Sequence, residues 1–343
     1  MRKYKAALLG YYGFNNLGDD LLLQASINLL VDSGISRGEI IAFSNNPDET
    51  AKNFYIESIN RWHYREIWQI LKNCESLILG GGGLFQDSTS IKSCIWYWAI
   101  MRLANLAGTK IFALGQSIGP LESRFGRFFT GNALRLCEFV HVRDNNSQKI
   151  AENFNCRNVI KGSDIALSLV REITGKMTRD NTCYIETISE SEGLPQKSQE
   201  KQERMLINLR PCKNLDSFVK VIQPNINNYP GEKIGVALSP EDENALKYLK
   251  LDKIIRVKNF HEACEIWQNS KIALGMRLHF GVLSRIFATP LALMPYDVKV
   301  SEFANESGVP CIIDKWENPL KPREINLLYY DKICTWINTE LTK

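Results

Sequence analysis

Short apolar segments alternate with helix-length amphipathic segments along most of this 343-residue chain. The strand-like segments of the first half end in glycine-rich or polar turns and comprise residues 6–9, 40–43, 76–79, 110–114 and 139–142. Apolar runs of this length between turn residues are typical of buried strands. Because a helix fits between successive strands, the alternation predicts an α/β fold, with mostly parallel sheets covered by helices on both faces.

The composition changes between residues 173 and 204, where charged and polar residues dominate. Such a segment is typical of a linker or insert. We therefore predict an N-terminal Rossmann-like domain over residues 1–172 and a C-terminal Rossmann-like domain over residues 205–320. Residues 321–343 carry apolar side chains at helical spacing, which predicts a C-terminal helix that packs back toward the first domain.

Composition excludes several classes of protein. Forty-two Lys and Arg against 38 Asp and Glu give 42 − 38 = +4, too small an excess to indicate nucleic-acid binding. The nine cysteines are odd in number and never spaced Cys-x-x-Cys, which favours free thiols in a reducing cytosol over disulfides or a zinc site. No apolar run approaches the roughly 18 residues of a membrane span. We expect a cytoplasmic protein with no metal site.

Cationic residues follow two predicted strands of the second domain. The motif at residues 275–279 (GMRLH) follows one strand, and the motif at residues 296–299 (YDVK) follows the next. Ligands of open α/β sheets bind beyond the carboxyl ends of the strands, so the motifs indicate a site for a phosphate or carboxylate. The planar fork of Arg277 suits two phosphate oxygens, and Lys299 and Arg210 are further candidates for the same anion. An ordinary ion pair is the alternative for Arg277.

A glycine turn with two carboxylates follows the first strand. Its glycines, Gly13 and Gly18, have P-loop spacing, but the Lys and Ser/Thr of a P-loop are missing. Asp19 and Asp20 would repel a phosphate, so they suit hydrogen bonding to sugar hydroxyls or removal of a proton from one. The alternative is an ordinary helix N-cap.

Further polar candidates lie along the first domain. Glycines at residues 80–83 allow close approach of the backbone to a ligand, Gly81 and Gly82 in particular, or simply form a tight turn. The candidates for binding sugar hydroxyls are Gln86, Asp87 and Gln116. Arg143 either belongs to the site or forms an internal salt bridge within its Arg-Asp motif.

These motifs, taken in order, resemble the polysaccharide pyruvyl transferase family. They are residues 10–20 (GYYGFNNLGDD), 80–90 (GGGGLFQDSTS), 115–120 (GQSIGP), 143–144 (RD), 275–279 and 296–299. The resemblance implies two Rossmann-like α/β/α domains that face one another across a cleft, as in GT-B proteins. It also implies transfer of the enolpyruvyl group of phosphoenolpyruvate onto two hydroxyls of a polysaccharide or lipid-linked saccharide, which forms a pyruvate ketal and releases phosphate. Phosphoenolpyruvate is then a co-substrate, and no cofactor is expected.

The implied reaction needs a proton carrier and a base. His279 is the natural carrier because an imidazole titrates near neutrality, although it could instead donate a hydrogen bond to the phosphate. His63, His141 and His261 are interpreted as structural. Many members of the family carry Asp-Glu where this chain has Asp-Asp, so Asp19 is favoured over Asp20 as the base.

Two questions stay open in the sequence. Residues 96–98 and 124–129 mix aromatic residues with arginine, which indicates either core packing or peripheral contact with the inner face of the plasma membrane. The alternatives to a pyruvyltransferase are a GT-B glycosyltransferase that uses a nucleotide sugar and a non-catalytic protein that binds sugar phosphates. The oligomeric state and the acceptor sugar are not encoded in any pattern that we recognise.

Overall fold

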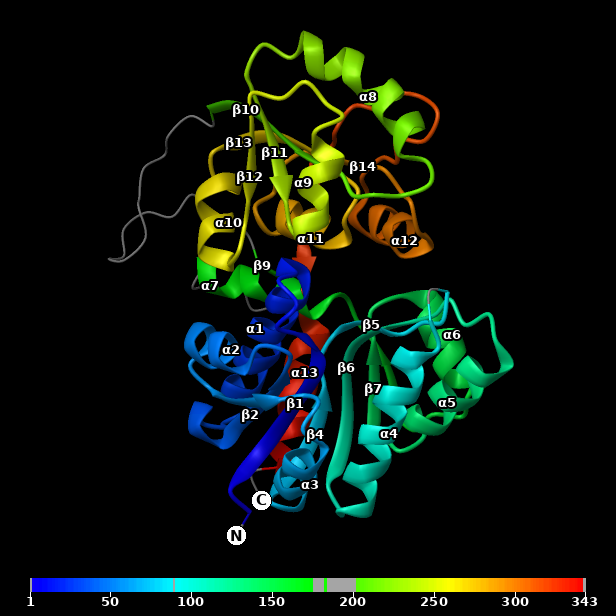
Figure 1. Cartoon of the computed structure of the whole chain (residues 1–343). Helices are drawn as coiled ribbons and strands as arrows, with labels where there is room; N and C mark the ends of the chain where they lie inside the picture. Colours follow the sequence, from blue (N-terminus) through cyan, green and yellow to red (C-terminus); the bar gives the residue numbers. More distant parts are fainter. Residues whose placement is uncertain (1, 89, 175–181, 184–201, 342–343) are drawn as a thin grey trace. The chain divides into compact units, whose positions relative to one another are not determined.

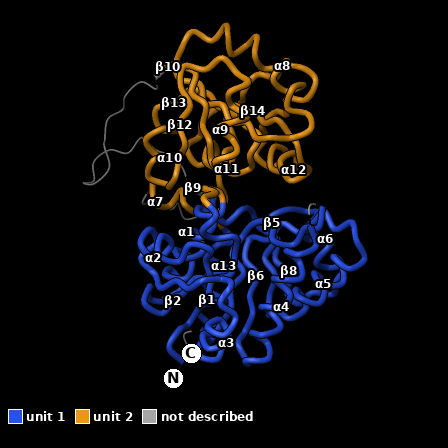
Figure 2. The backbone as a smooth tube through the Cα atoms, in the orientation of Figure 1, with its two compact units in different colours: residues 1–14, 19–166, 328–343 blue, residues 15–18, 167–327 orange. Residues whose placement is uncertain are grey.

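The computed structural model describes residues 2–88, 90–174, 182–183 and 202–341 (Figure 1). The chain forms two compact units (Figure 2). Unit 1 comprises residues 1–14, 19–166 and 328–343, and unit 2 comprises residues 15–18 and 167–327. The short segment 15–18 and residues 167–172 thus belong to unit 2, although the sequence placed both in the first domain. Most of the predicted linker, 173–204, lies outside the described residues.

Unit 1 is built on a parallel sheet. Its strands are β1 (Tyr4–Tyr12), β2 (Ile40–Ser44), β3 (Glu57–Asn60), β4 (Cys74–Leu79), β5 (Gly82–Phe85), β6 (Lys110–Ile118), β7 (Phe139–Val142) and β8 (Val159–Lys161). They lie in the order β3-β2-β1-β4-β6-β7-β8, and β5 pairs with β6. The chain therefore changes direction across the sheet between β1 and β4, where doubly wound folds bind ligands.

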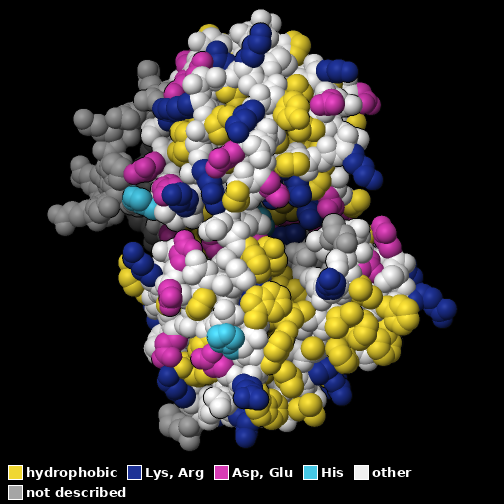
Figure 3. Space-filling view, in the orientation of Figure 1, with side chains coloured by type: hydrophobic (Ala, Val, Ile, Leu, Met, Phe, Trp, Pro, Cys, Tyr) yellow, Lys and Arg dark blue, Asp and Glu magenta, His cyan; other side chains and the backbone are white. Residues whose placement is uncertain are grey.

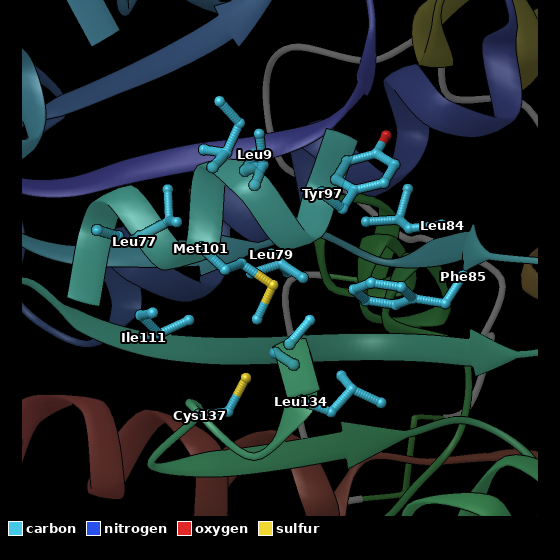
Figure 4. Packing of buried hydrophobic residues seen from close by; sticks show 14 of the residues in the cluster. Leu9, Leu77, Leu79, Leu84, Phe85, Tyr97, Met101, Ile111, Leu134 and Cys137 are labelled. Atoms are coloured by element: carbon cyan, nitrogen blue, oxygen red, sulfur yellow. The ribbon is translucent and has the colours of Figure 1, made fainter. Parts of the chain in front are cut away.

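Helices cover both faces of this sheet (Figure 1). They are α1 (Leu17–Asp32), α2 (Pro47–Phe54), α3 (Tyr64–Lys72), α4 (Lys92–Leu106), α5 (Arg124–Leu134), α6 (Asn145–Asn153) and α13 (Leu328–Leu341). In α4 the buried residues Tyr97, Ile100, Met101 and Ala104 recur at helical spacing. Figure 4 shows Tyr97 and Met101 against strand residues of the sheet, among them Leu79. This packing covers one face of the sheet.

The C-terminal helix α13 is part of unit 1. Its Trp336 meets Phe112 of β6 and Phe139 of β7 edge-on, with ring centroids 5.1 and 4.6 Å apart. Tyr329 donates a hydrogen bond to the carbonyl of Asp164 (3.1 Å). The helix predicted near the C-terminus is therefore present and anchored by aromatic packing.

Unit 2 is a smaller sheet of the same design. Its parallel strands are β10 (Gln202–Asn208), β11 (Glu232–Ala237), β12 (Lys253–Arg256), β13 (Ser270–Gly275) and β14 (Leu291–Leu293), in the order β12-β11-β10-β13-β14. Its helices are α7 (Val170–Thr174), α8 (Leu215–Asn228), α9 (Pro240–Leu246), α10 (Phe260–Trp267), α11 (Leu278–Ile286) and α12 (Val298–Ser307). Here the change of direction falls between β10 and β13. The predicted class, parallel α/β sheets in two Rossmann-like units, is confirmed.

Candidate active site

Polar residues gather beyond the carboxyl ends of the unit 2 strands. Arg210 follows β10, residues 239–242 follow β11, Arg277 follows β13, and Tyr296 with Lys299 follows β14. The buried amide of Asn208, the last residue of β10, connects three strands. Its Nδ2 donates to the carbonyl of Val236 (2.9 Å), and its Oδ1 accepts from the backbone N–H of Arg277 (2.9 Å). The sheet order therefore brings these residues to the switch point of unit 2.

Arg277 is held by two carboxylates. Its Nε donates to both oxygens of the fully buried Asp242 (2.8 and 2.7 Å). Its Nη2 donates to Asp242 (2.7 Å), to the Ser239 hydroxyl (2.6 Å) and to Glu241 (2.6 Å). Burial alone would lower the pKa of Arg277, but the hydrogen bonds and charges of Asp242 and Glu241 raise it. Arg277 therefore forms the ion pairs that were the alternative to anion binding, with Asp242 and Glu241 as partners.

The other two predicted anion-binding cations also have partners. Arg210 donates from Nη1 to the Tyr296 hydroxyl (2.8 Å), lies over the ring at 4.5 Å from its centroid, and stands 3.9 Å from Glu241. Lys299 lies 3.2 Å from Asp297, the N-cap of α12. Glu241 thus joins Arg277 and Arg210, and its side chain is 56% exposed. The strands bring the three cations to one sheet edge, where nearby carboxylates balance their charge.

His279 lies in the first turn of α11, next to Arg277. Segment 15–18, which belongs to unit 2, packs on this region: the N–H of Leu17 donates to the carbonyl of Leu238 (2.9 Å). A Cβ added to Gly18 would collide with Nδ1 of the His279 ring. The glycine in the first motif is therefore needed because its backbone lies against the histidine, a relation that the sequence did not reveal.

Asp19 and Asp20 open α1, in unit 1. Burial, together with the negative charges of Asp19 and Glu49, raises the pKa of Asp20 to about 7. Among the described residues no cation pairs with Asp20. A carboxyl group with this pKa can both give and take a proton near neutrality.

The glycines predicted to approach a ligand have tight surroundings. A Cβ on Gly81 would lie 2.6 Å from Cδ2 of Leu22, and Gly82 has φ +112°. Gln116 is fully buried and donates from Nε2 to the carbonyls of Gly80 (2.7 Å) and Leu114 (2.9 Å). These contacts fix the backbone at the switch point of unit 1. The predicted roles of Gly81, Gly82 and Gln116 in acceptor binding stay predictions.

Asp87 is a loop anchor. Its Oδ1 accepts from the N–H of Glu122 (2.7 Å), and its Oδ2 accepts from the N–H (2.9 Å) and hydroxyl (2.5 Å) of Ser123. Burial would raise the pKa of Asp87, but these hydrogen bonds outweigh it and lower the pKa. The neighbouring Gln86 is half-buried, and its carbonyl accepts a hydrogen bond from Cys94. Sugar binding by either residue stays a prediction.

Arg143 forms a buried salt bridge with Asp164 (2.6 Å), and the two side chains are 6% and 2% exposed. The internal salt bridge considered for the Arg-Asp motif therefore exists, but the partner is Asp164. Asp144 instead caps α6 by accepting from the N–H of Ser147 (2.6 Å). His141 nearby is buried, and burial lowers its pKa to about 4, in keeping with a structural histidine.

An arginine surrounded by aromatic rings lies beside the first motif in unit 1. Arg61, 3% exposed, donates to the carbonyl of Gly10 (2.8 Å). Its guanidinium lies 4.0 Å from the ring centroid of Trp96 and 5.2 Å from those of Phe14 and Trp62. Tyr11 stacks on Phe14 with centroids 4.0 Å apart. Tyr11 and Trp62 are 44% and 47% exposed, so this cluster presents aromatic surface to solvent.

A family comparison decides what these motifs belong to. The model of the polysaccharide pyruvyl transferase family matches residues 16–298. The chain belongs to the polysaccharide pyruvyl transferase family. The resemblance inferred from the motifs is therefore confirmed, and pyruvyl transfer to a polysaccharide is the activity of this family. No curated protein sequence matches this family member significantly.

Solved structures similar to this pyruvyl transferase share its fold. UDP-GlcNAc 2-epimerase from Methanocaldococcus jannaschii has a TM-score of 0.58 and 13% identity over 99% of this chain and 93% of that one. The enzyme from Neisseria meningitidis, bound to UDP-GlcNAc, has a TM-score of 0.55 and 11% identity over 98% of this chain and 91% of its own. These are GT-B-fold proteins, so the likeness confirms the GT-B-like class and, at this identity, the fold alone.

No helix in the described residues of this pyruvyl transferase is long and apolar enough to cross a membrane. No group of three or more His, Cys, Asp or Glu in the same residues is arranged to hold a metal ion.

Proposed function

We propose that this protein transfers the enolpyruvyl group of phosphoenolpyruvate onto two hydroxyls of a saccharide, forming a pyruvate ketal and releasing phosphate. The observation that carries the proposal is the set of cations at the switch point of unit 2. Arg277, Arg210 and Lys299 follow three strands, two of them on either side of that point. Phosphoenolpyruvate carries a phosphate and a carboxylate, which need several cationic donors at one place.

The two carboxylates that pair with Arg277 differ in exposure, which supports replacement of one of them by the anionic donor. Glu241 is more than half exposed and can turn into water, whereas Asp242 is buried and keeps Arg277 in position. The phosphate or carboxylate of the donor then replaces Glu241 as the partner of Arg277 and Arg210. The N-terminus of α11 adds backbone N–H groups to the same edge.

The proposed reaction needs a proton carrier and a base, for which His279 and the aspartates are the candidates. Protonation of the methylene carbon leaves a cation at C2, one hydroxyl attacks it, phosphate departs, and the second hydroxyl closes the ring. His279, beside Arg277, is the proposed proton carrier. Asp19 remains a proposed base, and the raised pKa of Asp20 supports Asp20 for that role as well, because a base with a pKa of about 7 accepts a hydroxyl proton effectively near neutral pH.

The acceptor is proposed to use the exposed aromatic surface of unit 1. Tyr11 and Trp62 present ring faces of the kind that pack against the C–H face of a sugar ring, and buried Arg61 fixes their neighbours. Both residues lie at carboxyl ends of strands: Tyr11 is the penultimate residue of β1, and Trp62 lies just beyond β3.

Binding calorimetry with phosphoenolpyruvate tests the donor assignment, with uridine diphosphate titrated in parallel. We expect phosphoenolpyruvate to bind and Arg210→Ala to weaken it by about 1.5–3 kcal/mol, the usual loss for a hydrogen bond to a charged group. Arg277→Ala should weaken it at least as much, provided circular dichroism shows a folded variant. The second candidate is a glycosyltransferase that uses a nucleotide sugar, because proteins of the GT-B-like fold shown for this chain include such enzymes. Binding of the nucleotide alone would replace the proposal with that candidate.

A further inference from the structure

One surface of unit 1 combines exposed aromatic rings with exposed arginines, of which Arg127 donates from Nε to the carbonyl of Leu121 (3.0 Å). In α5, Arg124, Phe125, Arg127 and Phe128 are all exposed, Phe125 at 69% and Phe128 at 58%. Residues three and four apart share a helix face, so the four side chains form one patch at the start of this helix. Large apolar residues this exposed, grouped on one face, are unusual unless something binds them.

The neighbouring helix α4 extends the patch. Its exposed Ile95 and Arg102 lie seven residues apart, on one stripe of the helix. Trp98 of α4 meets Phe129 of α5 edge-on with centroids 5.0 Å apart, so the two helices are packed together. Figure 3 shows hydrophobic side chains gathered over these helices. We name Ile95, Arg102, Arg124, Phe125, Arg127 and Phe128 the α4–α5 surface.

The charge of this surface has one sign. Neither α4 nor α5 contains an Asp or Glu. Among the described residues, no carboxylate forms a salt bridge with Arg102, Arg124 or Arg127. Two acidic residues border the patch: Glu122, two residues before α5, and Asp87, whose carboxylate accepts from the N–H and hydroxyl of Ser123 at the N-cap of α5. A cationic, aromatic surface complements an anionic partner that also accepts apolar groups.

We propose that the α4–α5 surface docks this protein on an anionic lipid bilayer. Phe125 and Phe128 insert at the boundary between headgroups and acyl chains, and the three arginines lie over lipid phosphates. A folded protein partner would have to supply both an acidic and an apolar face, whereas a bilayer with anionic lipids supplies both everywhere. The inference rests on surface chemistry and is independent of the donor that the enzyme uses.

Vesicle co-sedimentation of the full chain tests the proposal. Vesicles of phosphatidylcholine alone are compared with vesicles of phosphatidylcholine mixed with phosphatidylglycerol, at low and high salt. We expect pelleting with the anionic vesicles that decreases with salt. We expect Phe125→Ser with Phe128→Ser, and separately Arg124→Gln with Arg127→Gln, to reduce partitioning on the order of tenfold.

Matched controls lie on unit 2. Tyr248→Ser removes an aromatic residue that is 63% exposed, and Lys247→Gln with Lys250→Gln removes two exposed cations. Both controls should pellet like the wild type. Wild-type protein that stays in the supernatant, equal binding to phosphatidylcholine alone, or control losses equal to those of the α4–α5 variants would each overturn the proposal. So would light scattering that shows a dimer which only the α4–α5 variants dissociate, because the surface would then bind a second copy.

Discussion

The switch points of the two units have the same topology but differ in charge: cations and carboxylates are paired in unit 2, whereas carboxylates cluster in unit 1. In unit 2 each predicted anion-binding cation has a carboxylate within 4 Å, as in the Arg277–Asp242 pair. In unit 1, burial and then the negative charges of Asp19 and Glu49 raise the pKa of the Asp20 carboxyl to about 7. An edge with balanced charge can exchange an internal anion for an anionic ligand. An acidic edge with a raised pKa is suited to moving protons on a neutral ligand.

The largest expected effect concerns the buried pair of unit 2. Arg277→Met leaves the fully buried Asp242 without its cation, which should lower the free energy of unfolding by about 3–5 kcal/mol. Arg210→Met is the matched control, because its carboxylate partner Glu241 is largely exposed and the loss should be below about 1 kcal/mol. Chemical denaturation of both variants measures the difference. Equal losses would show that Asp242 does not depend on Arg277.

The next effect tests the acidic edge of unit 1. The unfolded chain loses the Asp20 proton near its ordinary pKa of 3.8, whereas the folded protein keeps it until about pH 7. The stabilisation by this proton is therefore complete below about pH 4 and is lost as the pH rises to about 7. The loss is at most about 4–5 kcal/mol, from 7 − 3.8 = 3.2 pH units at ~1.4 kcal/mol each.

Asp20→Asn removes this titration while keeping a neutral polar side chain. The variant should gain stability relative to wild type between pH 4 and pH 7, as measured by denaturation at each pH. Glu75→Gln is a control, since this partly buried carboxylate already pairs with Lys5 at 2.9 Å. A wild type and an Asp20→Asn variant with parallel stability profiles would contradict the raised pKa.

The sequence predicted some of these relations and could not predict others. Arg277 and Lys299 were identifiable because each follows an apolar run that forms a strand. Their partners were not: Asp242 precedes Arg277 by 35 residues, and strand order alone brings them together. Strands β3 and β8 were missed because they lie at the sheet edges and are short or largely polar. The assignment of segment 15–18 to unit 2 depends on backbone contacts that leave no periodic pattern.

A smaller effect is expected where segment 15–18 meets α11. Gly18→Ala would force the His279 ring to move, at about 1–3 kcal/mol of stability, the usual cost of overpacking. Pyruvyl transfer should fall more than phosphoenolpyruvate affinity, because the proposed proton carrier is displaced and the arginines are not. Gly38→Ala is the control, since nothing lies within 4 Å of its added Cβ. Unchanged turnover in Gly18→Ala would separate His279 from the chemistry.

The smallest expected effect tests whether Glu241 competes with the anionic donor for Arg277 and Arg210. Glu241 accepts from Arg277 at 2.6 Å and lies 3.9 Å from Arg210, in the place proposed for the donor's negative charge. Glu241→Gln should therefore tighten phosphoenolpyruvate binding by about 0.2–1 kcal/mol, the range for an exposed ion pair, and the gain should shrink as salt is added. Glu265→Gln, an exposed residue of α10 in the same unit, should leave affinity unchanged. Weaker binding by Glu241→Gln would contradict this competition. It would mean that the Glu241 carboxylate holds the two arginines in the geometry that binds the donor.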